Sequence, residues 1–113
     1  MTTNIPTADA HIGVVLVDDH RLFREGVASL LGRAEDITLV GEASSGVAAV
    51  PLVEALQPDI VLMDVKMPDG DGITATRAII AACPHVGVIM LTMFEDDESV
   101  FAALKAGGRV FVI

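Results

Sequence analysis

Three carboxylates and one hydroxyl stand directly after apolar runs of the sequence. They are Asp18, Asp19, Asp64 and Thr92. Carboxylates gathered in one crevice repel each other, so a divalent cation is their natural counter-charge, and all-oxygen ligands favour magnesium over zinc. A carboxylate held beside magnesium can attack a phosphoryl group, and a threonine hydroxyl can donate a hydrogen bond to the product. These residue types therefore predict a magnesium site suited to phosphoryl transfer.

Each of these residues, taken singly, has a simpler explanation. Asp18 or Asp19 can cap a helix, Asp64 can form a turn, and Thr92 can be a β-branched residue that closes a strand. Only their arrival at the same edge of a sheet would favour the functional interpretation.

The apolar runs that precede these residues are short and rich in β-branched side chains, which is typical of strands buried on both faces. Segments with apolar residues at helical spacing follow them. The predicted strands are Ile12–Val17, Ile37–Val40, Asp59–Met63, Val86–Leu91 and Val110–Ile113, and the predicted helices are Arg21–Arg33, Val47–Leu56, Ile73–Cys83 and a fourth around Val100–Leu104. This alternation predicts an α/β fold with a parallel sheet, in which ligands bind beyond the carboxyl ends of the strands.

Local signals mark several helix ends. Ser44 or Ser45 is expected to cap the second helix, in which Pro51 predicts a kink or an early start. The segment 67–72 has strong turn chemistry, and the acids Glu95–Glu98 suit the first turn of the fourth helix, where the helix dipole favours them.

Composition narrows the class of protein. The 113 residues suit one domain, and 16 acidic against 7 basic residues give a net charge of −9, which opposes binding to nucleic acid or to an anionic membrane by this chain alone. No apolar stretch approaches the roughly 20 residues that cross a bilayer, and no secretory signal is visible, so the cytoplasm is the expected location. The single Cys83 predicts neither a disulfide within the chain nor a zinc site.

Several motifs together resemble the receiver domains of bacterial two-component response regulators. They are VVLVDD at 14–19, DIVLMDVKMP at 59–68, the loop PDGDG, Leu91 with Thr92, and KAG at 105–107. The stretch LTMFEDDESVFAALKAG is most similar to the subfamily whose receivers are followed by a LuxR-type helix-turn-helix DNA-binding domain. The resemblance covers nearly the whole chain.

This resemblance implies a flavodoxin-like, doubly wound, five-stranded parallel sheet of order 2-1-3-4-5, with residues 1–11 as an N-terminal extension and 12–113 as the receiver domain. It implies phosphorylation by a sensor histidine kinase and control of transcription through a DNA-binding domain that this chain lacks. Such a protein is a signalling phosphoacceptor that catalyses only its own phosphorylation and dephosphorylation. Thr92 and Phe111 match the positions that rearrange on phosphorylation.

The resemblance also implies roles at the acidic residues. Asp64 corresponds to the phosphorylated residue. Asp19 and Asp64 correspond to carboxylate ligands of Mg²⁺, the backbone carbonyl of Lys66 completes the protein ligands, and Asp18 acts through the water shell of the metal.

Two features depart from the family pattern. The lysine that follows the fifth strand in the family falls one residue past Ile113, and the fifth helix is absent from the chain. A sheet face without that helix should expose apolar surface on the order of several hundred Å². Such a patch invites pairing between copies of the chain. The sequence therefore predicts a truncated receiver that forms a homodimer, for example by domain swapping.

Three other interpretations remain open from the sequence. A phosphohydrolase with Asp64 as nucleophile is disfavoured because Lys66, and no second acid, stands two residues later. A nucleotide- or flavin-binding module is disfavoured because no glycine-rich phosphate motif follows a strand. A receiver that folds but does not signal has the same motif residues.

Overall fold

The computed structural model describes residues 11–65, 67, 71–92 and 104–112, of which residues 71, 92 and 110–112 are described by their backbone alone. The described elements are β1 (Ile12–Val17), α1 (Arg21–Leu31), β2 (Ile37–Ala43), α2 (Gly46–Leu56), β3 (Ile60–Asp64), α3 (Asp71–Ala82), β4 (Gly87–Thr92) and β5 (Arg109–Val112). Most lie within a few residues of the expected bounds. The predicted fourth helix falls largely outside the described residues.

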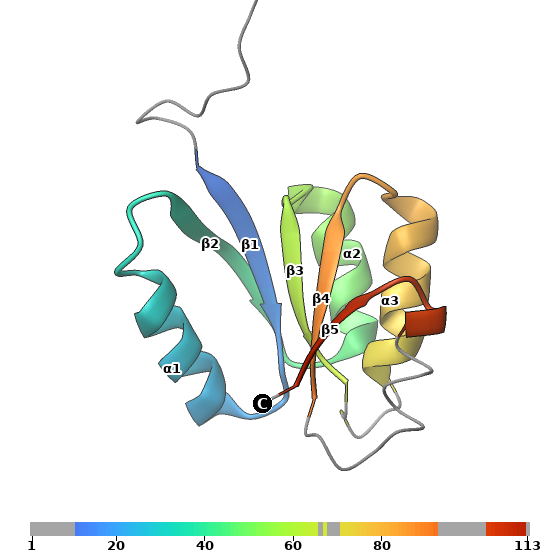
Figure 1. Ribbon diagram of the computed structural model, residues 1–113, viewed down its shortest axis with the longest axis horizontal. Helices are drawn as coiled ribbons and strands as arrows, with labels where there is room; N and C mark the ends of the chain where they lie inside the picture. Colours follow the sequence, from blue (N-terminus) through green and yellow to red (C-terminus); the bar gives the residue numbers. More distant parts are fainter. Residues whose placement is uncertain (1–10, 66, 68–70, 93–103, 113) are drawn as a thin grey trace, which may run out of the picture.

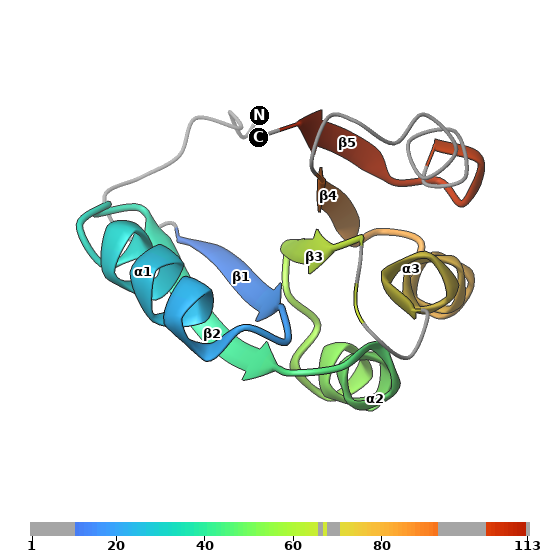
Figure 2. The ribbon, with the colours of Figure 1, turned by 90° about the horizontal axis from the view of Figure 1, so that it is seen from below.

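The five strands form one parallel sheet of order β2-β1-β3-β4-β5, which confirms the expected flavodoxin-like topology (Figure 1). After β2 the chain crosses back over β1 and places β3 on its other side. The strand order therefore reverses between β1 and β3, and α1 lies on the opposite face of the sheet from α2 and α3 (Figure 2). Reversals of this kind leave a crevice at the carboxyl ends of the two strands.

The principal core lies between the sheet and the pair α2 and α3. Alternate residues of β1, β3 and β4 point into it, because successive side chains of a strand face opposite sides. These residues are at most 3% exposed: Val15, Val17, Val61, Met63, Val88 and Met90. Val53 of α2 and Ile79 of α3 close the core from the helical side, each at most 1% exposed. β3, which ends in Asp64, and β1, which ends just before Asp18, are thus fixed by the most buried part of the fold.

The face of the sheet under α1 is less completely covered. Leu16 of β1 is fully buried there, whereas Leu62 of β3 and Ile89 of β4 are only partly buried. No residue of α1 itself is buried, and its Leu22 and Leu30 are 83% and 64% exposed. Helix α1 therefore lies against the edge of the sheet, over β2, and not over its centre.

Strand β2 runs three residues beyond the predicted end, to Ala43. Its continuation pairs with β1 after a register shift between Val14 and Val15, so that Val15 lies opposite Gly41. A Cβ at Gly41 would meet Leu56 Cδ1 at 2.7 Å and Leu52 Cδ2 at 3.4 Å, because α2 lies directly over the strand there. Gly41 thus allows α2 to approach β2 closely. A run of apolar residues in the sequence does not reveal such an approach.

Helix α2 begins as expected at a serine cap. The hydroxyl of Ser45 accepts a hydrogen bond from the amide of Ala48 at 3.1 Å. The helix continues unbroken through Pro51 to Leu56, where Gln57 adopts a left-handed conformation with φ of 48°. Within the described residues, no helix is both long and apolar enough to cross a bilayer.

Candidate functional site

The site lies where β1 and β3 end side by side. These strands are parallel neighbours whose last paired residues are Val17 and Met63, so the residues that follow emerge at the same edge of the sheet. The amide of Asp18 donates to the carbonyl of Ala43 at 3.1 Å, and the amide of Val65 donates to the carbonyl of Leu91 at 3.1 Å. Backbone pairing therefore extends past both strands and fixes the chain on either side of the crevice.

Four side chains converge at this edge. One ligand atom from each of Asp18, Asp19, His20 and Asp64 lies within 4.8 Å of the others. Burial differs along the group, since the side chain of Asp18 is 7% exposed, that of Asp19 24% and that of His20 70%. The three predicted carboxylates are thus brought together. His20 joins them as a fourth member that the sequence analysis did not select.

Asp18 lies deepest and has its own partners. Its Oδ1 accepts hydrogen bonds from the backbone amide of His20 at 2.7 Å and from the His20 ring at 3.1 Å. The N-cap residue of α1 is His20 and neither aspartate, and the side chain of His20 makes no cap hydrogen bond. The capping alternative therefore does not account for Asp18 or Asp19.

The ring of His20 lies between two carboxylates. Its Nδ1 is 3.1 Å from Asp18 Oδ1 and also 3.1 Å from Asp19 Oδ1. The hydrogen bond to Asp18, followed by the charges of Asp19, Asp18 and Asp64, raises the pKa of His20 above its ordinary value of 6.5. In its protonated form, His20 offsets part of the negative charge of Asp18 and Asp19 at the open side of the crevice.

Arg24 lies nearby and pairs with the backbone and with β2. Its guanidinium donates to the backbone carbonyl of Asp18 at 2.6 Å, and its Nε lies 3.5 Å from Glu42 Oε1. This pairing ties the first turn of α1 to β2 and to the end of β1. The positive charge of Arg24 is therefore directed at the scaffold of the site.

The donor set fits a hard divalent cation. Asp19 Oδ1 is inaccessible to solvent and accepts no hydrogen bond from the described residues, and its contact with His20 Nδ1 at 3.1 Å is an ion pair when that ring is protonated. A buried carboxylate oxygen without a donor is costly unless a cation satisfies it. Together with the carboxylates of Asp18 and Asp64, this oxygen provides the all-oxygen environment that Mg²⁺ prefers.

Gly72 supports the site from α3. A Cβ on Gly72 would overlap the carbonyl oxygen of Asp64 and would come within 3.1 Å of the α-carbon of Val65. The start of α3 can therefore pack against the end of β3 only where no side chain intervenes. The sequence predicts Gly72 only as part of a turn, since close packing between distant backbone segments has no local signal.

The other predicted site residues are Thr92, Phe111 and Lys66. Thr92 is the last residue of β4 and pairs with Val112, and Phe111 of β5 pairs with Leu91, which in turn lies opposite Asp64. Their backbones thus lie on the strands next to the crevice, while their side chains lie outside the described part of the chain. Lys66 lies outside the described residues altogether.

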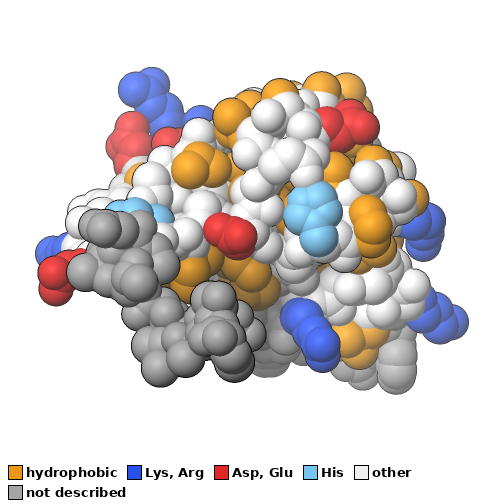
Figure 3. Space-filling view, turned by 90° about the horizontal axis from the view of Figure 1, so that it is seen from above, with side chains coloured by type: hydrophobic (Ala, Val, Ile, Leu, Met, Phe, Trp, Pro, Cys, Tyr) orange, Lys and Arg blue, Asp and Glu red, His pale blue; other side chains and the backbone are white. Residues whose placement is uncertain are grey.

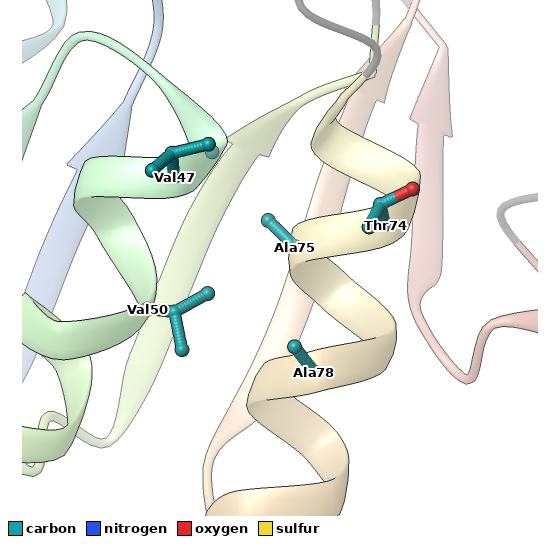
Figure 4. A pocket seen from close by; sticks show the side chains of 6 residues that line it. Val47, Val50, Thr74, Ala75 and Ala78 are labelled. Carbon is teal, nitrogen blue, oxygen red and sulfur yellow. The ribbon is translucent and has the colours of Figure 1, made fainter.

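A shallow groove of about 280 Å³ lies apart from this crevice, between α2 and α3 (Figure 4). Its walls are small or aliphatic apart from one threonine: Gly46, Val47, Val50, Thr74, Ala75 and Ala78. None of these six side chains is ionisable, so the groove offers no chemistry for phosphoryl transfer.

The opposite end of the molecule shows no comparable concentration of acids among the described residues. In the view onto the amino ends of the strands, acidic side chains are scattered among apolar and basic ones (Figure 3). The convergence of carboxylates is therefore a feature of the carboxyl edge of the sheet.

Comparison with known proteins agrees with this geometry. The profile of the response regulator receiver domain matches residues 14–113. The response regulator protein VraR of Staphylococcus aureus is 42% identical over 102 residues, which cover 90% of this chain and 49% of VraR. The uncharacterized transcriptional regulatory protein YhcZ of Bacillus subtilis is 40% identical over 98 residues, which cover 87% of this chain and 46% of YhcZ. The chain thus spans about half the length of these curated relatives.

Solved structures give the same result. The signal receiver domain of the response regulator NarL from Mycobacterium tuberculosis superposes with a TM-score of 0.84 at 35% identity, covering 91% of this chain and 83% of that one. A LuxR-family two-component response regulator from Aurantimonas sp. superposes with a TM-score of 0.82 at 33% identity, covering 89% and 72%.

Proposed function

The chain belongs to the response regulator receiver domain family, and from this premise we propose that Asp64 accepts a phosphoryl group from a sensor histidine kinase in a Mg²⁺-dependent reaction. The observation that carries the proposal is the convergence of Asp18, Asp19 and Asp64 at the strand-order reversal between β1 and β3. A nucleophilic carboxylate needs neighbours that hold a cation, and Asp18 and Asp19 are the proposed neighbours of Asp64.

The proposed metal ligands are the carboxylates of Asp19 and Asp64 and the backbone carbonyl of Lys66, with Asp18 acting through metal-bound water. Bound Mg²⁺ supplies positive charge that offsets the charge on the oxygens of the transferring phosphoryl group. The buried Oδ1 of Asp19, which accepts no hydrogen bond from the described residues, supports this assignment.

In the proposed reaction, a carboxylate oxygen of Asp64 forms a bond to phosphorus while the bond from phosphorus to the donor's imidazole nitrogen breaks. The nitrogen keeps the electron pair of the broken bond, and Asp64 becomes an acyl phosphate. Two strands position this nucleophile, because Asp64 is the last residue of β3 and lies opposite Leu91 of β4. The hydroxyl of Thr92, one residue further along β4, is proposed to hydrogen-bond the phosphoryl group.

The proposed output is a rearrangement of Thr92 and Phe111 that changes the surface near β5. Such a switch needs only a small free-energy difference between two packings. Because the curated relatives are about twice as long and include a transcriptional regulatory protein, we propose that the output acts on transcription through a C-terminal DNA-binding domain. The proposed place of action is the cytoplasm.

A second copy of the chain is the proposed partner at the apolar side of α1. Leu22 and Leu30 are exposed there, and the sheet beneath is only partly covered. We expect light scattering to show dimers of the wild type that are lost in Leu22→Glu, whereas Val47→Glu, at a 77% exposed site on α2, leaves the mass unchanged. A monomeric wild type would contradict the dimer.

The phosphoacceptor proposal is tested by incubating the chain with acetyl phosphate and Mg²⁺ and measuring intact mass. We expect one added phosphoryl group on the wild type and none on Asp64→Asn. Asp36→Asn is the matched control, because Asp36 is an exposed acid remote from β3, and it should label as the wild type does. Equal labelling of Asp64→Asn, or labelling that does not require Mg²⁺, would count against the proposal.

A further inference from the structure

His20 has a place in the site that the phosphoacceptor scheme does not use. Its Nδ1 lies 3.1 Å from one oxygen of Asp18 and 3.1 Å from one oxygen of Asp19, and it belongs to the same group of ligand atoms as Asp64. The imidazole is therefore part of the ligand cluster and not a bystander on the surface of α1.

The spacing suits direct ligation. Two ligands that occupy neighbouring corners of an octahedron, each about 2.1 Å from the metal, lie about 3.0 Å apart. The separation of His20 Nδ1 from Asp19 Oδ1, the oxygen of a proposed direct ligand, is 3.1 Å, close to that value. The ring is also 70% exposed, so it can adjust its position without disturbing the core.

Ligand chemistry distinguishes the cations that such a group can hold. Imidazole nitrogen is a good ligand for zinc, nickel, copper and iron and a poor one for magnesium, which prefers oxygen. Oxygen ligands alone satisfy the preference of Mg²⁺, whereas carboxylates with an imidazole form the mixed nitrogen and oxygen set that first-row transition metals favour. His20 therefore has a function at this site only when the metal is of the second kind.

We propose that His20 is a fourth protein ligand of the Asp18, Asp19 and Asp64 site and selectively strengthens its binding of first-row transition metal ions such as Ni²⁺ and Zn²⁺. The inference rests on the proposed function, since it concerns the same metal site. Mg²⁺ binds through the carboxylates, and His20 sets how strongly the transition metals compete with it. The buried Oδ1 of Asp19, which lies beside His20 and accepts no hydrogen bond from the described residues, is the oxygen that the two kinds of ion share.

The test is calorimetric titration of the metal-free 113-residue chain with Ni²⁺, and separately with Mg²⁺, at one alkaline pH. Loss of groups that only support metal ligands typically costs about 10–100-fold in affinity, so loss of a ligand should cost at least about tenfold. We expect His20→Ala to weaken Ni²⁺ binding by that factor or more and to change Mg²⁺ binding by less than about threefold. His85→Ala and His11→Ala, at exposed histidines outside the cluster, are the matched controls and should bind both ions as the wild type does.

A spectroscopic readout separates ligation from a merely structural role. With Co²⁺ bound, the proton NMR spectrum should contain a strongly shifted ring signal that His20→Ala lacks and His85→Ala keeps. Unchanged Ni²⁺ affinity in His20→Ala, equal weakening of Ni²⁺ and Mg²⁺, or the absence of a shifted ring signal would overturn the proposal. Failure of Asp64 labelling with acetyl phosphate would instead count against the phosphoacceptor function, so the two outcomes are distinguishable.

Discussion

Gly72 packs against the carbonyl oxygen of Asp64 so closely that a Cβ in its place would overlap that oxygen. The beginning of α3 therefore lies directly on the end of β3. Any change that moves one of them moves the proposed phosphorylation site, even though Gly72 itself has no chemistry.

The first prediction follows from this contact. Gly72→Ala should displace the start of α3 or the backbone of Asp64, destabilise the fold by about 1–3 kcal/mol as overpacked sites do, and slow labelling of Asp64. Gly26→Ala is the control, because Gly26 lies inside α1 and a methyl group there would have nothing within 4 Å of it. That change should stabilise the protein by about 0.5–1 kcal/mol. Chemical denaturation measures the free energy of unfolding of both variants. A Gly72→Ala variant as stable as the wild type would contradict the close contact between Gly72 and the Asp64 carbonyl.

Removing one charge from the cluster should weaken the response to metal. Asp19→Asn is expected to reduce Mg²⁺ affinity at least about tenfold, which at saturating ion removes about 1.4 kcal/mol of metal-linked stabilisation. Thermal unfolding measured with Mg²⁺ and with EDTA gives the metal-linked stabilisation of each variant as the difference between the two conditions. Asp36→Asn should keep the wild-type difference, and the same Mg²⁺ effect in Asp19→Asn would exclude Asp19 as a ligand.

The ring of His20 should titrate at unusually high pH in the metal-free chain. Its hydrogen bond to Asp18 and the charges of Asp19, Asp18 and Asp64 raise its pKa above 6.5. Since the folded-state pKa is the higher one, the stabilising contact is fully present below the ordinary pKa and is lost as pH rises through the raised pKa. NMR titration should show the pKa falling toward 6.5 in Asp18→Asn, whereas the same pKa in wild type and Asp18→Asn would remove the assigned cause.

Burial predicts where truncation is costly. Ile79 of α3 is 1% exposed within the main core, so Ile79→Ala should destabilise by about 2–5 kcal/mol. Leu22 of α1 is 83% exposed, and Leu22→Ala should change the stability of the monomer by less than about 0.5 kcal/mol when measured at concentrations too low for the proposed dimer to form. Comparable losses in urea denaturation would contradict the assignment of the core to the α2 and α3 side.

Sequence patterns predicted the sheet well because its strands are buried on both faces. β1 and β3 are short apolar runs that end in aspartates, so both the strands and the edge at which they deliver carboxylates were visible. The end of β2 was not, because Gly41 and Glu42 interrupt the apolar run although both pair with β1. Whether such residues belong to a strand depends on the register of strand pairing and on how closely a helix approaches. Neither leaves a local pattern in the sequence.

The cluster itself was only partly predictable. Asp18, Asp19 and Asp64 are predicted because they follow strands, but His20, which stands between Asp19 and the predicted helix Arg21–Arg33, is not among the predicted site residues. Its ring joins the carboxylates because the chain turns between β1 and α1, with the His20 amide bonded to Asp18 Oδ1. The adjacency of His20 to Asp19 was the available signal. The helical spacing of α1 predicted its existence, but not that it would contribute no buried residue.

The absence of any buried residue in α1 bears on how the molecule moves. A helix held by few buried apolar contacts can open while the rest of the structure stays intact, with a free energy well below that of global unfolding. Amide hydrogens of α1 should then exchange with solvent faster than those of β1 and β3. Because His20 is the N-cap residue of α1, each such opening would briefly loosen one wall of the acidic crevice while β1, which precedes Asp18, and β3, which ends in Asp64, stay in place.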